Sequence, residues 1–172
     1  ESRGRGGLAR PVGDGQVSFG VSYSAFGEDF ADTTTYSTGD RLTLTGGWSF
    51  PVRSTTVFLS GWNLFRMAGQ QFGGDAPKEN VANLSAGVSF DVGSVLVQPN
   101  IETRLYQSNG MRAGQMMNLG ARLRIGAGRF SFYPSAGYSI GKIYNVGTPA
   151  SPGDGSAEDV TGFRGSLTIR VN

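Results

Sequence analysis

Apolar and polar residues alternate along most of this chain. In VLVQPNIETRL, residues 95–105, the odd positions are mostly apolar and the even positions are mostly polar. Side chains of a β-strand point alternately to two faces, so a period of two residues predicts a strand. Eight segments keep this period and none keeps the helical one: 16–26, 41–50, 54–66, 82–92, 95–105, 116–125, 129–143 and 160–171. The pattern predicts an all-β fold.

The connections between these segments alternate in length. Long connections occupy 26–40, 66–80, 106–114 and 144–159, and short turns occupy 51–54, 92–94 and 126–128. The hairpins also repeat, because NLSAGVSFDVGSVLVQP (83–99) and NLGARLRIGAGRFSFYP (118–134) align along their whole length. Short turns at one end and long connections at the other predict a closed, eight-stranded antiparallel up-and-down barrel.

Two features of the repeat bear on individual strands. Pro99 and Pro134 fall at the same place in its two copies, and we expect each to lie in a bulge that bends its strand. The alternation within 54–66 is ambiguous. Alignment with the next hairpin places Val57, Leu59 and Phe65 on the shared apolar face. It places Phe58, Trp62 and Leu64 on the polar face.

Composition indicates which face of the barrel meets water. The chain has 172 residues, a net charge of +2 and 28 glycines, and only Lys78 and Lys142 are lysine. A charge this small gives no reason to expect nucleic acid as a partner. The polar face carries mainly Gly, Ser, Thr and Asn, which suit a crowded barrel interior, whereas a solvated exterior would carry Lys and Glu. The apolar face is therefore predicted to contact lipid, as in a transmembrane barrel. A soluble lipocalin-like, lipid-binding barrel is the more distant alternative.

Aromatic residues on the apolar face gather toward the strand ends. This distribution is typical of the aromatic girdles at the two interfaces of a membrane. The girdle beside the short turns comprises Trp48, Phe50, Phe90, Phe130 and Phe132. The girdle toward the long loops comprises Tyr23, Phe65, Tyr106, Tyr138 and Tyr144.

Charged residues on the polar face form the candidate functional site. They are Asp91, Glu102, Arg104, Arg122, Arg124, Arg164 and Arg170. Charges inside a narrow barrel must pair, so we expect a network in which Glu102 and Arg104 face two arginines of the next strand. Eight strands enclose an interior that side chains can fill, so this network is predicted to plug the lumen. A narrow pore for small solutes or anions is the alternative, since rings of arginine favour anions.

The eight alternating segments, the alternation of long and short connections and the Gly-rich polar face resemble the small outer-membrane barrels of the OmpA/OmpX type. The resemblance covers 16–171. It implies insertion into the bacterial outer membrane by the barrel assembly machinery, with both ends in the periplasm and the long loops outside the cell. Such barrels usually finish in an aromatic residue, whereas this chain finishes in IRVN at Asn172. The Gly- and Arg-rich residues 1–15 are expected to form a flexible periplasmic tail before the barrel of 16–172.

Nothing in the sequence indicates an enzyme. The chain has no histidine and no cysteine, which removes the commonest general base and the thiolate ligands of metals. GYSIG (137–141) matches the nucleophile-elbow pattern, but its serine lies within a predicted strand rather than in a strand-to-helix turn. We expect no catalysis, no metal and no cofactor.

The long loops carry the function that the sequence predicts. Residues 27–40 and 145–159 contain several acidic residues and no basic ones. Loops held on a rigid scaffold commonly carry binding function. We therefore expect a structural, adhesive or binding role, with outer-membrane lipid, lipopolysaccharide or an extracellular molecule as the partner. The strands form either a monomeric barrel or part of a larger membrane assembly.

Overall fold

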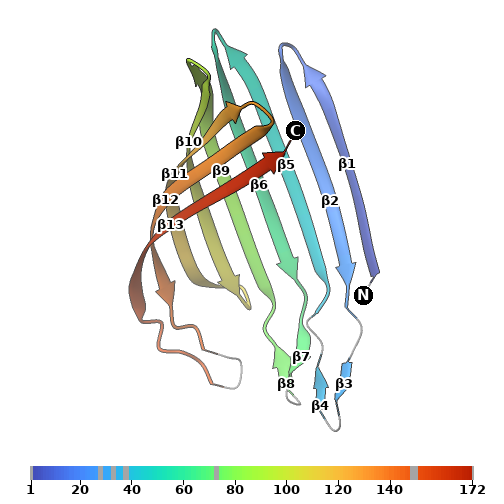
Figure 1. The fold of residues 1–172 in the computed structure, drawn as a ribbon. Helices are drawn as coiled ribbons and strands as arrows, with labels where there is room; N and C mark the ends of the chain where they lie inside the picture. The colour runs from blue at the N-terminus through green and yellow to red at the C-terminus, as the bar shows by residue number, and fades with distance from the viewer. Residues whose placement is uncertain are drawn as a thin grey trace.

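The computed structural model describes residues 2–26, 29–31, 34–36, 39–71, 74–147 and 151–171. Within them, nine strands form one antiparallel sheet in which each strand pairs with its neighbours along the chain. These strands are β1 (Ser2–Val12), β2 (Gly15–Ala25), β5 (Arg41–Val52), β6 (Thr55–Arg66), β9 (Glu79–Val92), β10 (Val95–Ser108), β11 (Met111–Ala127), β12 (Phe130–Tyr144) and β13 (Ala157–Val171). Two small hairpins lie in the long connections: β3 (Asp29–Ala31) with β4 (Thr34–Tyr36), and β7 (Gly69–Gln71) with β8 (Gly74–Ala76). Figure 1 shows the sheet curling, with β1 and β13 at its two open edges.

The sheet corrects two predictions and does not confirm a third. Residues 2–12, predicted to lie in a flexible tail, form β1, which pairs with β2 over its whole length. Alternation is hard to see in β1 because glycine and arginine occur on both of its faces, although Leu8 opposite Phe19 continues the apolar face. The strand number is therefore nine in the described residues, not eight. Closure is not observed either, since no described residue of β1 pairs with β13. The same residues contain no helix long and apolar enough to cross a membrane.

Tight two-residue turns join most of the strands. In four of those described only the first residue has positive φ: Gly13 (59°), Arg53 (57°), Gly93 (62°) and Gly128 (59°). At Asn109–Gly110 both residues have positive φ, 50° and 80°, which is the type I′ geometry that this residue pair favours. This turn replaces the long connection predicted for 106–114. The strict alternation of long and short connections therefore fails between β10 and β11.

Neither proline of the repeat lies in a bulge, contrary to the prediction. Pairing of β10 with β9 pauses at Pro99 and the residue before it, then resumes in the same register. Pairing of β12 with β11 pauses in the same way at Pro134. Proline has no N–H to donate, so each ladder omits two residue pairs without shifting. A register shift does occur in β10, but it lies at Tyr106/Gln107.

Apolar side chains cover one face of the sheet and do not form a core. Among the described residues no apolar side chain is fully buried, and Phe163 (77 %), Leu84 (60 %) and Phe19 (55 %) are largely exposed. A water-soluble sheet protein would bury such residues in its interior. The exposed apolar face therefore fits contact with lipid.

The polar face is the concave one. One cavity of about 600 Å³ is lined both by Phe58 of β6 and by Arg164 of β13, so their common face lies inside the curl. The lipocalin-like alternative needs the opposite arrangement, with the apolar face inside. The register also confirms the faces predicted for 54–66, because Leu59 lies opposite Trp48 on the apolar face.

Candidate functional site

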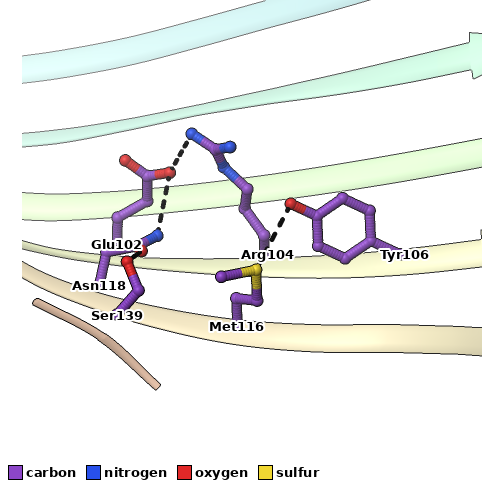
Figure 2. A network of polar contacts seen from close by, with 6 residues as sticks. All are labelled: Glu102, Arg104, Tyr106, Met116, Asn118 and Ser139. Carbon is purple, nitrogen blue, oxygen red and sulfur yellow. Dashed lines mark hydrogen bonds and ion pairs between the residues drawn. The ribbon is translucent and has the colours of Figure 1, made fainter. Parts of the chain in front are cut away.

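Four polar residues are connected on the inner face of β10, β11 and β12, and Figure 2 shows them from close by. Arg104 Nη2 lies 2.6 Å from Glu102 Oε1. Asn118 Nδ2 donates to the same carboxylate oxygen at 3.5 Å, and Ser139 Oγ donates to Asn118 Oδ1. We call Glu102, Arg104, Asn118 and Ser139 the lumen network.

The lumen network follows from the register of the strands. Glu102 lies directly opposite Asn118, and Asn118 lies directly opposite Ser139, so one row crosses three strands. Side chains that face each other across antiparallel strands are close enough to interact. Arg104 follows Glu102 by two residues and therefore points to the same face. The structure thus joins the two β10 charges named by the sequence and adds an amide and a hydroxyl.

Arg104 also lies over an aromatic ring. Its guanidinium lies 5.7 Å from the centre of the Trp62 ring, and its buried Nε has no hydrogen-bond partner among the described residues. Tyr106 Oη donates to Met116 Sδ at 3.9 Å beside it (Figure 2). The predicted place of Tyr106 in the outer girdle is therefore wrong. Tyr106 alternates with Glu102 and Arg104 along β10 and so shares their inner face.

The other charges predicted for the network lie on the inner face but do not join it. They are Asp91, Arg122, Arg124, Arg164 and Arg170, and none of them makes an ion pair within the described part of the chain. The predicted contact of Glu102 with arginines of β11 is wrong, because Asn118 lies opposite Glu102. Arg170 instead lies over the Tyr133 ring, 5.2 Å from its centre.

The cavity of about 600 Å³ lies beside the lumen network, and we call it the lumen cavity. Its lining includes Arg122, Arg164, Ser135, Ser166 and Gln98. Ser135 Oγ and Ser166 Oγ lie 2.7 Å apart and share a hydrogen bond. Polar and cationic groups thus line the space that the curled sheet encloses.

Glycine makes room for a large side chain at one side of the lumen cavity. Gly87 lies opposite Phe58 on the inner face. A Cβ at this position would press into the Phe58 ring and would lie 2.6 Å from the Pro99 carbonyl oxygen. The glycine therefore lets the Phe58 ring extend over the neighbouring strand.

Side chains at the loop end of the strands tie the long connections to the sheet. Arg66 Nη2 lies 2.5 Å from Glu79 Oε1, and the two residues lie opposite each other on β6 and β9. Asp40, just before β5, accepts hydrogen bonds from the Tyr23 hydroxyl and, at 3.0 Å, from the Phe26 N–H. These two hydrogen bonds, chiefly the one from Tyr23, lower the pKa of the Asp40 carboxyl below its ordinary value.

Asp154 organises the connection between β12 and β13. Its Oδ1 accepts hydrogen bonds from the Ser156 N–H at 2.9 Å and from Asn145 Nδ2 at 3.1 Å. Hydrogen bonds from Ser156, its side chain first and then its backbone, lower the pKa of Asp154, and Asn145 adds to this. The other acidic loop differs, because the side chains of 27–38, on which its predicted binding role depends, lie outside the described residues.

The remaining girdle residues keep the apolar face that the sequence predicts. Beside the short turns, the Trp48 and Phe50 rings lie 4.5 Å apart and the Phe130 and Phe132 rings 6.4 Å apart, centre to centre. Tyr138 lies near the middle of β12 rather than at its loop end. The other members on this face are Tyr23, Phe65, Phe90 and Tyr144. Their contact with the membrane interfaces stays a prediction.

Comparison with known proteins bears on the fold. No protein-family model and no curated protein matches the chain. It is similar to outer-membrane-expressed OmpT of Vibrio cholerae, with a TM-score of 0.56 and 14 % identity over 95 % of this chain and 54 % of that one. It is also similar to the trimer form of in-vitro folded OmpT, an outer membrane protein of Vibrio cholerae (TM-score 0.56, 14 % identity, covering 95 % and 52 %). A further structure of in-vitro folded OmpT from Vibrio cholerae gives a TM-score of 0.53 and 16 % identity, covering 95 % and 54 %.

The fold is that of an outer-membrane β-barrel. The chain spans about half the length of the OmpT structures that it matches. The predicted location, the bacterial outer membrane, agrees with these matches. The narrower resemblance to the OmpA/OmpX type is not supported, because the matches are to larger chains and the sheet has nine strands in its described part. Identity this low supports the fold and leaves function to be argued from the site.

Proposed function

We propose that the protein forms part of the wall of a water-filled pore in the bacterial outer membrane, through which small hydrophilic solutes diffuse. The observation that carries this proposal is the separation of the two faces. The outer face carries exposed apolar residues such as Phe163, and the concave face carries arginines and small hydroxyl residues. A transmembrane barrel with a polar interior has this arrangement.

The lumen is open rather than plugged in this proposal. The plug predicted from the sequence depends on a narrow barrel of eight strands. The described sheet has nine strands and both edges are unpaired, which supports a wider barrel. A second cavity, of about 740 Å³, lies along β1, β2 and β5 and is lined by small residues such as Ser18, Ser22 and Thr45. The pore requires no catalysis, and the predicted adhesive or binding role of the loops stays a prediction.

Single-channel recording tests the proposal. The protein, extracted from outer membranes in the assembly in which it occurs there, should give discrete conductance steps in a planar lipid bilayer. It should also let small neutral sugars swell liposomes. Protein that is folded, judged by a heat-dependent shift in gel mobility, but gives neither conductance nor swelling would contradict the proposal.

A matched pair of substitutions on β13 separates pore conductance from leakage around the protein. Ser166 lines the lumen cavity, and Leu167 beside it is 61 % exposed on the apolar face. Ser166→Trp should lower the single-channel conductance, because the indole occupies space inside the barrel. Leu167→Trp should leave the conductance unchanged, because its indole faces lipid. Equal effects of both substitutions would mean that ions do not pass through this lumen.

A further inference from the structure

We propose that the lumen cavity is a binding site for a small oxyanion, meaning a phosphate or carboxylate group, held between Arg122 and Arg164. The proposal rests on the proposed pore for access and deepens it by naming the class of solute. Both arginines line the lumen cavity, and neither makes an ion pair within the described residues.

The strand register places the two arginines on either side of β12, whose side chains there are small. Arg122 on β11 lies opposite Ser135 on β12, and Arg164 on β13 lies opposite Gly137, two residues further along β12. Residues two apart on a strand point to the same face. The inner-face residues of β12 between the two arginines, Ser135 and Gly137, are therefore small. They leave space above β12 for the two long arginine side chains.

The charges around the lumen cavity do not cancel. Glu102 is the one acidic residue in its described lining, and Arg104 Nη2 already lies 2.6 Å from its carboxylate. Asn118 donates to that carboxylate as well. Arg122 and Arg164 are therefore left without a compensating negative charge in the cavity. Two like charges that face one space repel each other, and an anion between them would offset that repulsion.

Hydrogen-bond donors complete the site. A guanidinium presents its N–H groups in a planar fork that matches the oxygens of phosphate or carboxylate. Ser135 and Ser166, whose hydroxyl oxygens lie 2.7 Å apart, lie in one row with Arg122. Serine hydroxyl hydrogens can turn toward a bound oxygen. Gln98 and Asn100 line the side toward β10.

Binding of inorganic phosphate tests the site directly. Phosphate would be titrated by calorimetry into the detergent-solubilised native assembly at low ionic strength, with sodium acetate and sodium chloride titrated separately. We expect phosphate and acetate to bind more tightly than chloride. Arg122→Gln and Arg164→Gln should each weaken phosphate binding by about tenfold or more, as expected for hydrogen bonds to a charged group.

Arg124→Gln is the matched control. Arg124 lies on the same strand and face as Arg122, two residues away, but does not line the lumen cavity. Its loss removes the same charge and should change phosphate binding less than about threefold. An equal loss of phosphate affinity in all three variants would overturn the site. It would show that the positive field of the whole lumen attracts phosphate, without a defined binding site. Undetectable binding to the unsubstituted protein, or equal affinity for phosphate and chloride, would overturn it too.

The same variants separate this inference from the proposed pore. Phosphate added to a bilayer recording should reduce the chloride current of the unsubstituted protein, and Arg122→Gln should abolish that reduction. If the protein forms discrete channels but Arg122→Gln and Arg164→Gln leave phosphate binding unchanged, the site is overturned and the pore stands. Arginine-dependent phosphate binding by a protein that never conducts would overturn the pore and leave the site standing.

Discussion

At the scale of single residues, Glu102 holds the lumen network together. It contacts both Arg104 and Asn118, and the side chains of Glu102 and Arg104 are 15 % and 31 % exposed. Glu102→Gln keeps the size of the side chain but leaves the Arg104 charge without its partner. We expect the free energy of unfolding to fall by roughly 1–2 kcal/mol, a value reduced from that of a fully buried charged pair because water still reaches Arg104. Urea unfolding from lipid vesicles, followed by tryptophan fluorescence, measures this change, since Trp62 lies beside Arg104.

Glu158→Gln is the matched control for this prediction. Glu158 carries the same charge on β13 and makes no ion pair within the described residues. Its loss should change the free energy of unfolding by less than about 0.5 kcal/mol. If the two variants unfold alike, the contacts of Glu102 contribute nothing particular to stability.

Arg53 and Asn109 are the two first residues of the described tight turns that are not glycine, and asparagine tolerates the left-handed region whereas arginine does not. Arg53 has a φ of 57°, whereas the equivalent turn between β9 and β10 begins with Gly93 at 62°. A side chain in this left-handed region costs roughly 1–2 kcal/mol, a cost that glycine avoids. Arg53→Gly should therefore raise the free energy of unfolding by about 1 kcal/mol, part of the gain being lost to the greater freedom of glycine in the unfolded chain. The reverse change, Gly93→Arg, should lower it by a similar amount in the same urea experiment. A destabilised Arg53→Gly protein would contradict this explanation.

At the scale of strands, alternation predicts what lies on each face but not what pairs. The period of two is visible in segments such as 95–105, where apolar and polar residues are distinct, and it places them in β10. In β1 the same period is hidden, because glycine occupies inner and outer positions alike and the backbone ladder does not need side chains. The predicted loop at 106–114 fails for a local reason: the Asn-Gly pair, a strong hairpin signal, lies within it.

The same limit applies to the candidate site, whose face could be predicted from the sequence but whose contacts could not. Alternation correctly puts Glu102, Arg104 and Arg122 on one face, because it depends only on position within a strand. Which of them meet depends on register between strands, and register is set by turn lengths and bulges. The tight turn at Asn109–Gly110 and the register shift at Tyr106/Gln107 together put Asn118 opposite Glu102. The Asn-Gly turn alone would put Met117 opposite Glu102, so this row follows only when the register shift is known as well.

Acid should loosen the connection between β12 and β13. The Ser156 and Asn145 hydrogen bonds lower the pKa of Asp154 in the folded chain. A carboxyl with a lowered pKa stabilises the folded form above its unfolded pKa and loses this effect as the pH falls through its folded pKa. Hydrogen exchange at the Ser156 amide, corrected for the intrinsic effect of pH, should therefore be slow near neutrality and become faster below about pH 4.

Asp154→Asn isolates the carboxylate in this experiment. The amide can still accept from the Ser156 N–H but does not titrate. Protection of Ser156 should then be weaker at neutral pH and should not change further on acidification. Protection in the unsubstituted protein that persists unchanged through the titration of Asp154 would contradict the role given to this side chain.

At the scale of the whole molecule, the direction of the edge strands restricts how the barrel closes. Neighbouring strands alternate in direction, and with nine in the described sheet β1 and β13 run the same way. Direct closure would need a parallel pair, whereas bacterial single-chain barrels have an even number of antiparallel strands. Closure with a second copy in the same membrane orientation would also need parallel pairs, because β13 of each copy would lie beside β1 of the other. We therefore expect an odd number of further strands between β13 and β1, which agrees with a chain that spans about half of the OmpT structures.

The absence of cysteine from the chain makes this closure testable by disulfide cross-linking in outer membranes. Ser135→Cys with Ser166→Cys should cross-link readily, because these residues face each other on β12 and β13. Ser166→Cys combined in turn with cysteine at Arg5, Gly7 or Ala9 of β1 should give no cross-link within one chain, because other strands separate the two edges. Backbone amides of β1 and β13 should nevertheless exchange as slowly as those of β9, since both edges are hydrogen-bonded in the assembly. A β1–β13 cross-link would instead mean that the nine strands close on themselves through a parallel seam, and fast exchange at both edges would mean that no strands cover them.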